Sequence, residues 1–586
     1  MVLQNLRRYA LLLLLLAIFA VFLIYPILLT VRDGFVEVGG DWLTPSDWTV
    51  RHVGSVFLDP VLRDGLVNAL FIAIATTLTC LVIALPLAVL SANFDYPGKK
   101  LWNAVILIPL ILPPFVGAIG MQQLLGRFGA INALLGTEID FLGSGRFWGV
   151  VLVEALHLYP ILYLNATAAL ANLDPALDEA AENLGAGTTK RFFRVTLPLI
   201  RPGLFAGATI VFIWSFTELG TPLMFDFYEV TPVQIFQRIK EVEDSAKPYA
   251  LTVVMLFSAA MLYIMGKMVF GGRAYAMYSK ASISASTKRL GTTGALLAVA
   301  LFASVTFLAV LPHIGVLLSS FSGNGAWYRS VLPRVLTTEH YVDALGHPLA
   351  MGSIRNSLFY ASTAMLVDIV LGVAIGYLIV RTKIFGRGLL DALSMLPLAV
   401  PGLVMAFGYV AMTLNPPFSW TAETAPAWGQ WFVPIAGAFD IVGQTPNPVT
   451  LLIIAYAIRR LPYVVRSTVA GLEQTSHEME EAALNLGASK FYAMRRVVVP
   501  LIMANLIAGG LLTFSFAMLE VSDSLILAQQ TQYYPITKAI YTFAARLGDG
   551  QYIASAMGVW GMALLTVTLV GASLMLGKKL GAIFRV

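Results

Sequence analysis

The sequence predicts an all-α polytopic membrane protein with about 12 transmembrane helices in two parallel six-helix repeats. Three observations support this fold class. Hydrophobic residues make up 58% of the 586 residues and charged residues only 12%, with a mean hydropathy of +0.78, whereas about one quarter of a soluble domain is charged. Twelve apolar stretches reach the roughly 20 residues that a helix needs to cross a hydrocarbon core of about 30 Å. One segment also recurs further along the chain, as in repeat proteins.

The apolar stretches give the expected spans. Arg7 and Arg8 precede the first, as in a signal peptide, but its apolar run is longer than such peptides carry and no small-residue cleavage site follows it. We therefore keep it as a span. The expected spans are residues 9–31, 67–92, 102–125, 147–171, 199–222, 249–271, 293–318, 354–380, 390–414, 449–472, 501–528 and 552–577.

Charge in the loops predicts the orientation. An even number of spans puts both termini on one side of the membrane. With the termini inside, Lys and Arg are more than twice as dense in the cytoplasmic pieces as in the outer loops, as the positive-inside rule requires. We therefore expect a multi-pass protein of the plasma (inner) membrane with both termini cytoplasmic.

Composition also excludes several kinds of site. The net charge of +5 is too small a surplus for nucleic-acid binding. The single cysteine, Cys80, lies in an apolar run, so neither a disulfide framework nor a Cys-rich metal site is expected.

An internal repeat organises the chain. Residues 179–186 (EAAENLGA) match residues 481–488 (EAALNLGA) at an offset of 302, and upstream the offset is 288, where Asn68 matches Asn356. Both copies begin with a span that runs inward, so the repeat is parallel. We expect a first half at 1–271 with a core at about 67–271, a polar cytoplasmic linker at 272–292, and a second half at 293–586 with a core at about 355–577.

The change of offset places 14 additional residues in an outer loop of the second half, around residues 415–448. This loop contains Trp420, Trp428 and Trp431 but no Lys or Arg. We expect it to fold over the outer mouth or contact a partner protein, with packing against a neighbouring outer loop as the alternative.

The repeated segment carries helix signals in the loops 172–198 and 473–500. In the first copy Asp174 is the expected N-cap, Pro175 takes the first helical position, and Gly185 ends the helix.

The second copy has the same signals. Thr475 or Ser476 is the expected N-cap, Glu478 is placed for a capping box, and Gly487 ends the helix. Each helix carries an apolar stripe at the spacing i, i+3, i+4, i+7, formed by Leu177, Ala180, Ala181 and Leu184 and by Met479, Ala482, Ala483 and Leu486. The stripe predicts docking to a partner, with packing on the chain's own spans as the alternative. Glu179 and Glu481 lie near the N-termini, where capping is the alternative to a docking role.

The Glu-Ala-Ala-x3-Gly segment, followed by Pro198 or Pro500, resembles the signature loop of permeases in binding-protein-dependent ABC importers of the type I, MetI-like fold. The resemblance covers nearly the whole chain, and two permease copies in one chain are most similar to the ferric-iron import permeases. It implies coupling helices that dock on ATP-binding subunits. The residues to which this role would fall are Glu179, Ala180, Ala181, Gly185, Glu481, Ala482, Ala483 and Gly487.

The resemblance also implies partners and cofactors. We expect two ATP-binding subunits forming a homodimer, a periplasmic or lipoprotein substrate-binding protein, and the lipid bilayer. No cofactor or metal is expected in this chain, and ATP-Mg is expected on the partner subunits, because no G-x4-G-K-[ST] string occurs here. The chain is thus expected to be a transport subunit and not an enzyme.

The substrate expected from the resemblance is ferric iron. Phosphorylated sugar, aminoethylphosphonate, thiamine or another small solute is the alternative for the same machinery. An ion-coupled secondary transporter, which also has twelve spans in two parallel repeats, is the second alternative.

Charged residues inside the expected spans are candidates for the substrate pathway, since a charge in mid-bilayer costs about 2.5–3.5 kcal/mol on insertion scales. We expect Arg459 or Arg460 to neutralise Glu520 or Asp368, and a purely structural buried pair is the alternative. The candidates are Glu218, Glu520, Asp368, Arg459 and Arg460.

Overall fold

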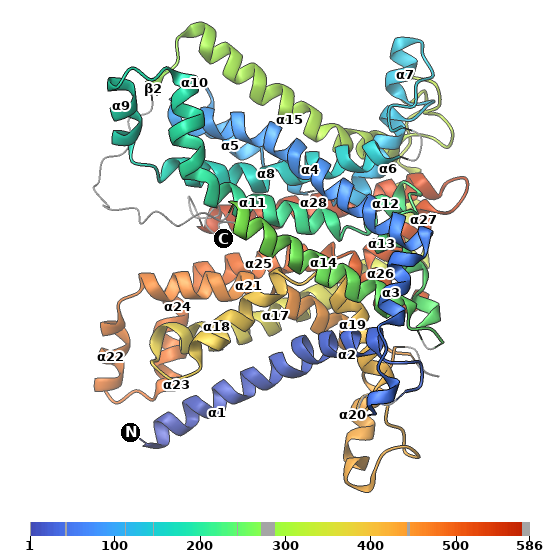
Figure 1. Cartoon of the computed structure of the whole chain (residues 1–586), viewed down its shortest axis with the longest axis vertical. Coiled ribbons are helices and arrows are strands. Elements are labelled where there is room, and N and C mark those ends of the chain that lie inside the picture. Colours follow the sequence, from blue (N-terminus) through green and yellow to red (C-terminus); the bar gives the residue numbers. More distant parts are fainter. Residues whose placement is uncertain are drawn as a thin grey trace. The chain divides into compact units, whose positions relative to one another are not determined.

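The computed structural model describes residues 2–40, 44–111, 113–143, 146–242, 244–270, 288–441 and 446–576. Helices account for nearly all regular structure in these residues (Figure 1), which confirms the all-α class. A single pair of two-residue strands is described, β1 (Phe94–Asp95) and β2 (Lys288–Arg289), which run parallel. Most of the predicted linker 272–292 lies outside the described residues.

The predicted repeat is visible element by element. α4 (Pro60–Asn93) and α17 (Pro348–Arg381) each have 34 residues, and their ends are separated by the predicted offset of 288. α9 (Pro175–Asn183) and α22 (His477–Asn485) each have 9 residues and are separated by the offset of 302. Since the sequence offset and the helix boundaries agree, the two halves share one helical plan.

Several helices are suited to crossing a membrane. Among the described residues, 7 helices are long and apolar enough, and three bent helix pairs raise the number to 10 if each pair is one span. The predicted spans 449–472 and 552–577 are helical too, as α21 (Val449–Gln474) and α28 (Gly550–Leu576). The multi-pass class is therefore confirmed, while the count of twelve spans stays a prediction.

Continuous spans at 102–125, 390–414 and 501–528 were wrong expectations, because the chain bends in each. The helical segments Arg387–Leu398 and Gly402–Leu414 meet at 104°, and Lys99–Leu110 and Pro114–Leu135 meet at 94°. Prolines stand at both breaks, and proline lacks the N–H and the space that an uninterrupted helix needs. In the third expected span, α25 (Met503–Met518) meets the helical segment before it at 76°. It then ends before α26 (Ser522–Leu527) begins.

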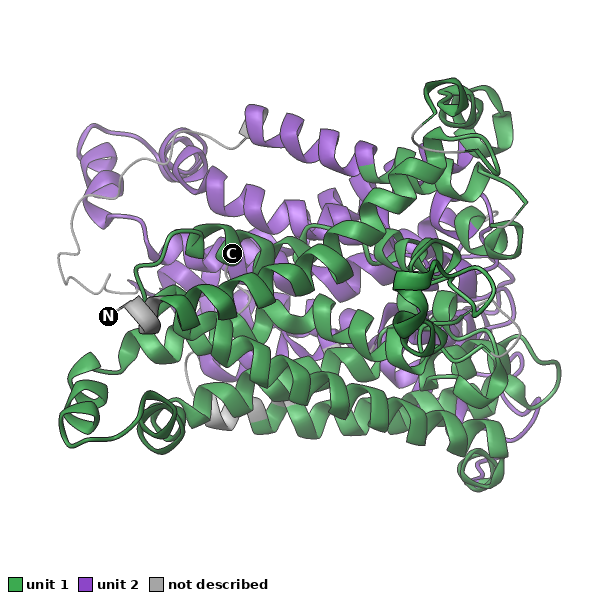
Figure 2. Cartoon of the chain, turned by 90° about the horizontal axis from the view of Figure 1, so that it is seen from below, with its two compact units in different colours: residues 1–63, 234–256, 339–583 green, residues 64–233, 257–338, 584–586 purple. Residues whose placement is uncertain are grey.

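The chain forms two compact units (Figure 2) that differ from the two sequence halves. Each unit contains the first span of one half with the core of the other half. The units are, for unit 1, residues 1–63, 234–256 and 339–583 and, for unit 2, residues 64–233, 257–338 and 584–586.

Glycines allow this exchange of first spans. In unit 1, α2 (Tyr25–Phe35) packs on α19 (Gly402–Leu414), where a Cβ on Gly408 would lie 2.7 Å from the carbonyl oxygen of Pro26. In unit 2, α15 (Thr292–Phe321) packs on α6 (Pro114–Leu125), where a Cβ on Gly120 would lie 2.3 Å from the carbonyl oxygen of Pro312. No residue with a side chain fits at either crossing without a shift.

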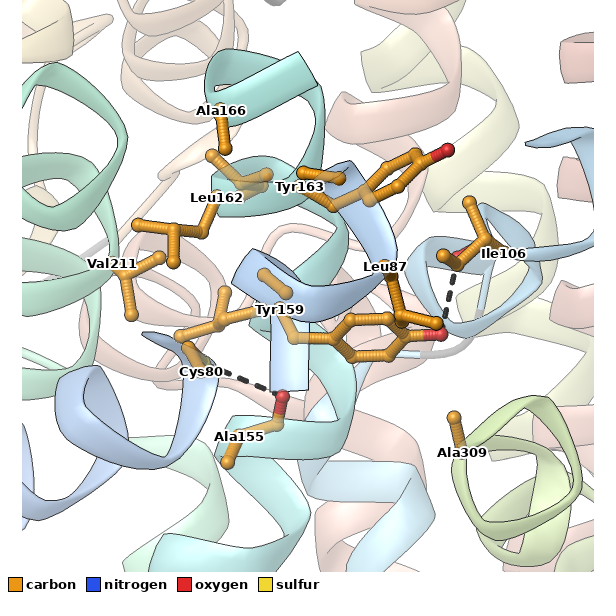
Figure 3. Packing of buried hydrophobic residues seen from close by; sticks show 14 of the residues in the cluster. Cys80, Leu87, Ile106, Ala155, Tyr159, Leu162, Tyr163, Ala166, Val211 and Ala309 are labelled. Carbon is orange, nitrogen blue, oxygen red and sulfur yellow. Dashed lines mark hydrogen bonds between the residues drawn. The ribbon is translucent and has the colours of Figure 1, made fainter. Parts of the chain in front are cut away.

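The interior of unit 2 is formed by α4 and α8 (Phe147–Ala171), with tyrosines among the largest buried side chains. Figure 3 shows the Tyr159 hydroxyl donating to the carbonyl of Ile106 at 3.4 Å and the Cys80 thiol donating to the carbonyl of Ala155 at 3.5 Å. Cys80 is thus a buried core residue that fixes α4 on α8.

The remaining α-helices complete the two units. They are α1 (Val2–Phe19), α3 (Arg51–Leu58), α5 (Lys99–Val105), α7 (Ala130–Leu135), α10 (Thr188–Arg191), α11 (Leu197–Phe216), α12 (Gly220–Met224), α13 (Thr231–Gln237), α14 (Lys247–Phe270), α16 (Glu339–Gly346), α18 (Arg387–Met395), α20 (Val433–Gly437), α23 (Lys490–Ala493), α24 (Val499–Leu501) and α27 (Ile536–Ala544). The 3-10 and π segments are η1 (Ala20–Ile24), η2 (Pro45–Asp47), η3 (Ile108–Ile111), η4 (Phe192–Thr196), η5 (Ile239–Glu241), η6 (Leu396–Leu398), η7 (Ala427–Phe432), η8 (Met494–Val498) and η9 (Thr531–Tyr533).

Candidate docking helices and intramembrane charges

The first repeated segment forms α9, with the predicted start and end. The Asp174 carboxylate accepts a 3.0 Å hydrogen bond from the N–H of the second helical residue. Gly185 has φ +79° and donates to the Glu182 carbonyl at 2.8 Å, while Ala186 donates to the Ala181 carbonyl at 3.0 Å. This pair of bonds is a Schellman motif, which needs a left-handed residue that glycine supplies at least cost. The prediction that Gly185 ends the helix is confirmed.

The second segment ends in the same way. Gly487 has φ +87° and donates to Leu484 at 3.0 Å, and Ala488 donates to Ala483 at 3.0 Å. Neither Gly185 nor Gly487 has another atom within 4 Å of the position that a Cβ would occupy. Backbone conformation alone therefore requires glycine there.

The N-cap of α22 is one of the two predicted residues, but the predicted capping box does not form. Ser476, and not Thr475, is the N-cap, and its hydroxyl accepts from the N–H of Glu478 at 3.2 Å. Glu478 is then the second helical residue instead of the third, so it cannot close a capping box. That part of the prediction was wrong.

The first glutamates of the two Glu-Ala-Ala segments do not cap their helices. Glu179 and Glu481 are each the fifth residue of their helix, beyond the first turn in which a side chain reaches the free N–H groups. Glu481 instead lies 3.0 Å from His477, one turn earlier. Both carboxylates are exposed and are free to face a partner.

The predicted apolar stripes point into open space. Leu184 is 89% exposed and Leu486 is 90% exposed, and Ala180 and Ala482 are exposed as well. In Figure 1, α9 and α22 lie beyond the ends of the long helices of their own units. Large exposed apolar side chains around small ones form a surface that a partner can approach closely.

Two predicted pathway arginines meet one predicted glutamate. Arg459 and Arg460 of α21 both bind the carboxylate of Glu520, Arg459 at 2.6 Å. The Arg459 guanidinium also lies 3.5 Å from Asp523, a residue that the sequence reasoning missed. A Cβ on Gly402 would overlap the same guanidinium, so glycine at the start of α19 makes room for it.

Asp368 forms no ion pair or hydrogen bond with this network among the described residues, although the charge of Arg460 acts on it. It is fully buried on α17, and neither of its carboxyl oxygens has a hydrogen-bond partner. Of the two acids that we expected an arginine to neutralise, Glu520 is therefore the one that forms the ion pair.

Glu218 and Glu520 lie at breaks between helices and not inside them, which corrects the prediction. α11 ends at Phe216, and the Glu218 carboxylate accepts from the N–H groups of Gly220 at 3.1 Å and Thr221 at 3.2 Å, the first residues of α12. An acid at a helix start satisfies N–H groups that have no partner within the helix.

A further buried acid, Glu154, was missed. It lies on α8 and accepts from the Ser215 hydroxyl and, at 3.5 Å, from the Thr76 hydroxyl. Its matched residue in the second half is Tyr456, so this acid is not part of the repeat. The presence of an acidic residue within the apolar run 147–171 is the sequence signal that could have identified it.

His157, the match of Arg459, lies within α8 and beside the bend that precedes α6. Its Nδ1 atom is 2.8 Å from the carbonyl oxygen of Pro109. With His313 and Pro114 it lines a small, partly open pocket. The two halves therefore place different side chains at equivalent bends.

The described part of the Trp-rich loop 415–448 packs on η1 and α2 of its own unit. The Tyr25 hydroxyl donates to the Pro416 carbonyl at 2.7 Å, and Phe22 stacks on Phe439 with ring centroids 6.0 Å apart. Trp428 and Trp431 are 72% and 70% exposed. Among the residues that the structure describes, no group of three or more His, Cys, Asp or Glu could hold a metal ion.

Comparison with known proteins decides the family. Residues 84–270 and again residues 368–577 match the family described as "Binding-protein-dependent transport system inner membrane component". The chain belongs to this family. The match occurs once in each half, as the internal repeat predicted.

Individual relatives cover most of the chain. The putative ferric transport system permease protein FbpB 1 of Haemophilus influenzae is 27% identical over 527 residues, which are 88% of this chain and 77% of the relative. The ferric transport system permease protein FbpB of Actinobacillus pleuropneumoniae is 26% identical over 548 residues, 92% of this chain and 74% of the relative. The molybdenum transport system permease protein ModB of Escherichia coli is 30% identical over 169 residues, 28% of this chain and 74% of the relative.

Family membership establishes the general role of this permease. It is a multi-pass transport component of an inner membrane that works with a substrate-binding protein and with ATPase subunits. The ion-coupled secondary transporter is thereby removed as an alternative.

Proposed function

We propose that this permease imports ferric iron delivered by an extracytoplasmic binding protein. Two relatives with ferric transport in their names match 88% and 92% of this chain, so the similarity includes both halves. The molybdenum relative matches a much shorter stretch. Phosphorylated sugar, aminoethylphosphonate and thiamine are the competing cargoes that the experiment below must exclude.

We further propose that α9 and α22 each dock one ATP-binding subunit. The observation that carries this proposal is the doubled helix with one Schellman ending and one uncovered apolar stripe. Because the two helices have the same length and the same ending, identical subunits fit both, and we propose a homodimer. ATP-Mg then binds on those subunits, and catalysis of hydrolysis lies outside this chain.

The orientation follows from the same proposal. ATP-binding subunits work in the cytoplasm, so α9 and α22 lie on that side together with both termini. The higher density of Lys and Arg in those loops supports this assignment.

The charges around Glu520 are proposed to line the substrate pathway in the second half. Glu520 lies at the break between α25 and α26, where the helices leave backbone groups free for other contacts, and Arg459 and Arg460 of α21 bind it there. Glu218 occupies the matching break in the first half.

The docking proposal is tested with Ala181→Trp and Ala483→Trp together. The large side chains should prevent close approach of the partner, so the ATPase subunits should no longer purify with the permease while the permease still inserts. Asn183→Trp and Asn485→Trp are the matched control, because both residues are exposed and two positions along a helix point to its opposite side. Wild-type recovery of ATPase subunits with the alanine variants would remove the docking role.

The substrate proposal is tested on the binding protein and then on the complex. We expect the binding protein to bind ferric ion and not phosphorylated sugars, aminoethylphosphonate or thiamine. Proteoliposomes holding the complete transporter should take up radioactive iron only with ATP and the loaded binding protein. Uptake of another of these solutes in place of iron would overturn the assignment of the cargo.

A further inference from the structure

One buried arginine connects three helices of unit 1. Arg381 is the last residue of α17 and its side chain is only 8% exposed. Its Nη2 atom donates to the carbonyl of Leu472 at 3.1 Å, and to the carbonyl and the hydroxyl of Thr475 at 2.9 Å each. Leu472 lies in the last turn of α21, whose carbonyl groups lack partners within the helix. Arg381 therefore fixes the end of α21 to the end of α17.

The same arginine faces the second docking helix. Its Nε atom lies 3.8 Å from the carboxylate of Glu480 on α22, and the Glu480 side chain is 7% exposed. The other oxygen of this carboxylate accepts from the Tyr377 hydroxyl at 3.1 Å. Tyr377 and Arg381 are four residues apart, on one face of α17. α22 is thus attached to α17 by two side chains.

α17 and α21 are in turn packed closely along their length. A Cβ on Gly372 would lie 2.6 Å from Val464, and a Cβ on Gly376 would lie 2.6 Å from Thr468. Contacts this close leave little freedom for the helices to slide independently. A displacement of α22 is therefore passed to α21, the helix that carries Arg459 and Arg460.

The first half lacks the arginine, the tyrosine and the threonine at the matched positions and has a shorter acid in place of the glutamate. Arg381 and Tyr377 correspond to Asn93 and Val89 of α4 at the offset of 288. At the offset of 302, Thr475 corresponds to Leu173 and Glu480 to Asp178.

α9 is held in a different way. The Arg191 guanidinium lies 3.5 Å from Asp178 and 2.5 Å from Glu182, so it ties α10 to α9. These ion pairs stay within the loop between the spans.

We propose that Arg381 is a positioning residue that links the second docking helix to α17 and α21, so that the two halves transmit motion of the ATPase subunits unequally. The proposal rests on the docking function proposed for α22. In the second half the link is the Arg381–Glu480 pair with its Tyr377 and Thr475 contacts. In the first half the ion pairs of α9 among the described residues join it to α10, so its motion reaches the spans through the backbone of the loop.

The test uses the complete permease with its ATPase subunits. Hydrogen exchange is measured with and without ATP, since ATP-induced changes in α17 and α21 do not depend on which cargo is carried. In Arg381→Gln we expect the ATP-induced changes in exchange to remain in α22 and to disappear from α17 and α21. Stimulation of ATP hydrolysis by the iron-loaded binding protein should fall about tenfold, within the range of typical coupling.

Further variants separate transmission from folding. Glu480→Gln keeps the shape of the side chain and the Tyr377 contact but removes the ion pair, so it should show a smaller loss in the same direction. Arg381→Lys keeps the charge and should restore part of the response. Arg466→Gln, at a half-exposed arginine of α21, is the matched control and should respond as wild type. Arg191→Gln should increase exchange in α9 alone.

The outcomes are distinct for the two proposals. If the ATPase subunits bind wild-type permease and Arg381→Gln and Glu480→Gln both keep ATP-induced changes in α17 and α21, the link through Arg381 is wrong. If the subunits do not bind wild-type permease, the docking function itself fails. If Arg191→Gln and Arg381→Gln reduce the ATP-induced exchange changes in α17 and α21 equally, the proposed difference between the two halves is wrong.

Discussion

Buried charged side chains in this permease have different surroundings, and Lys538 shows this most clearly. Its ammonium group is 6% exposed and donates to the Leu525 carbonyl at 2.6 Å. The rings of Phe236 and Tyr534 lie within 6 Å of it. Among the described residues no carboxylate lies within ion-pair distance of it. Burial, with a smaller contribution from Lys240, lowers the pKa of Lys538 to about 8.

This pKa predicts a dependence of stability on pH. The unfolded chain keeps the proton of Lys538 up to about pH 10.4, while the folded chain releases it near pH 8. Between these values the unfolded state binds more protons, so stability should rise with pH, by up to about 3 kcal/mol. Lys538→Met should remove this rise. Thermal unfolding in detergent from pH 7 to pH 10 measures it, and an unchanged slope in the variant would contradict the assignment.

The surroundings of Glu520 and Asp368 predict that substitutions of these two acids differ in their effect on stability. Glu520→Gln leaves Arg459 and Arg460 without their shared partner, and breaking a buried pair from one side costs about 3–5 kcal/mol. Asp368→Asn keeps the shape of a carboxyl group that makes no hydrogen bond, so it should cost less than Glu520→Gln. Unfolding midpoints of the two variants test this order. Greater damage from Asp368→Asn would show that Asp368 has a role that its contacts do not reveal.

At the scale of single elements, the docking helices depend on their ends. Asp174 and Ser476 provide the N-caps, and Gly185 and Gly487 take the left-handed conformation that a helix with this ending requires. These short helices have few other contacts, so local backbone energy decides whether their stripes are presented.

Gly487→Ala should therefore loosen α22. A side chain in the left-handed region costs about 1–2 kcal/mol, and the space around Gly487 is open, so no steric clash adds to this cost. Gly187→Ala is the matched control, because Gly187 has φ −65° and is equally open. Hydrogen exchange of α22 should rise only in the first variant. Equal exchange in both would show that the helix ending is not strained.

At the scale of the whole chain, the exchange of first spans joins the two halves within each compact unit. Gly120 and Gly408 allow α15 and α2 to cross at backbone contact distance. A fused chain thus forms two units, each of which needs residues from both halves.

Gly120→Ala tests this crossing. Its Cβ would meet the Pro312 backbone at 2.3 Å, and overpacking of this kind costs about 1–3 kcal/mol. Gly352→Ala on α17 meets nothing, and alanine in an open helix position is better by about 0.5–1 kcal/mol. The thermal midpoint should fall for the first variant and not for the second. Equal midpoints would mean that the crossing relaxes without cost.

The sequence by itself determined the helical membrane class, the repeat and the docking helices. These features rest on local rules: apolar length, a fixed offset, and cap and glycine signals that act within a few residues. The partner of an arginine, by contrast, was expected only as one of two acids. Packing of the folded chain makes Glu520 the partner, because contacts between residues far apart in sequence bring α21 next to the break after α25.

The tertiary structure alone decided the bends and the compact units. Prolines at 113–114, 397 and 401 permitted breaks but did not require angles near 90°, because a proline within a span, such as Pro160 of α8, can also remain helical. Which first span packs on which core depends on close crossings at Gly120 and Gly408. Glycine in an apolar run has several possible causes, and only the neighbouring backbone shows which one applies.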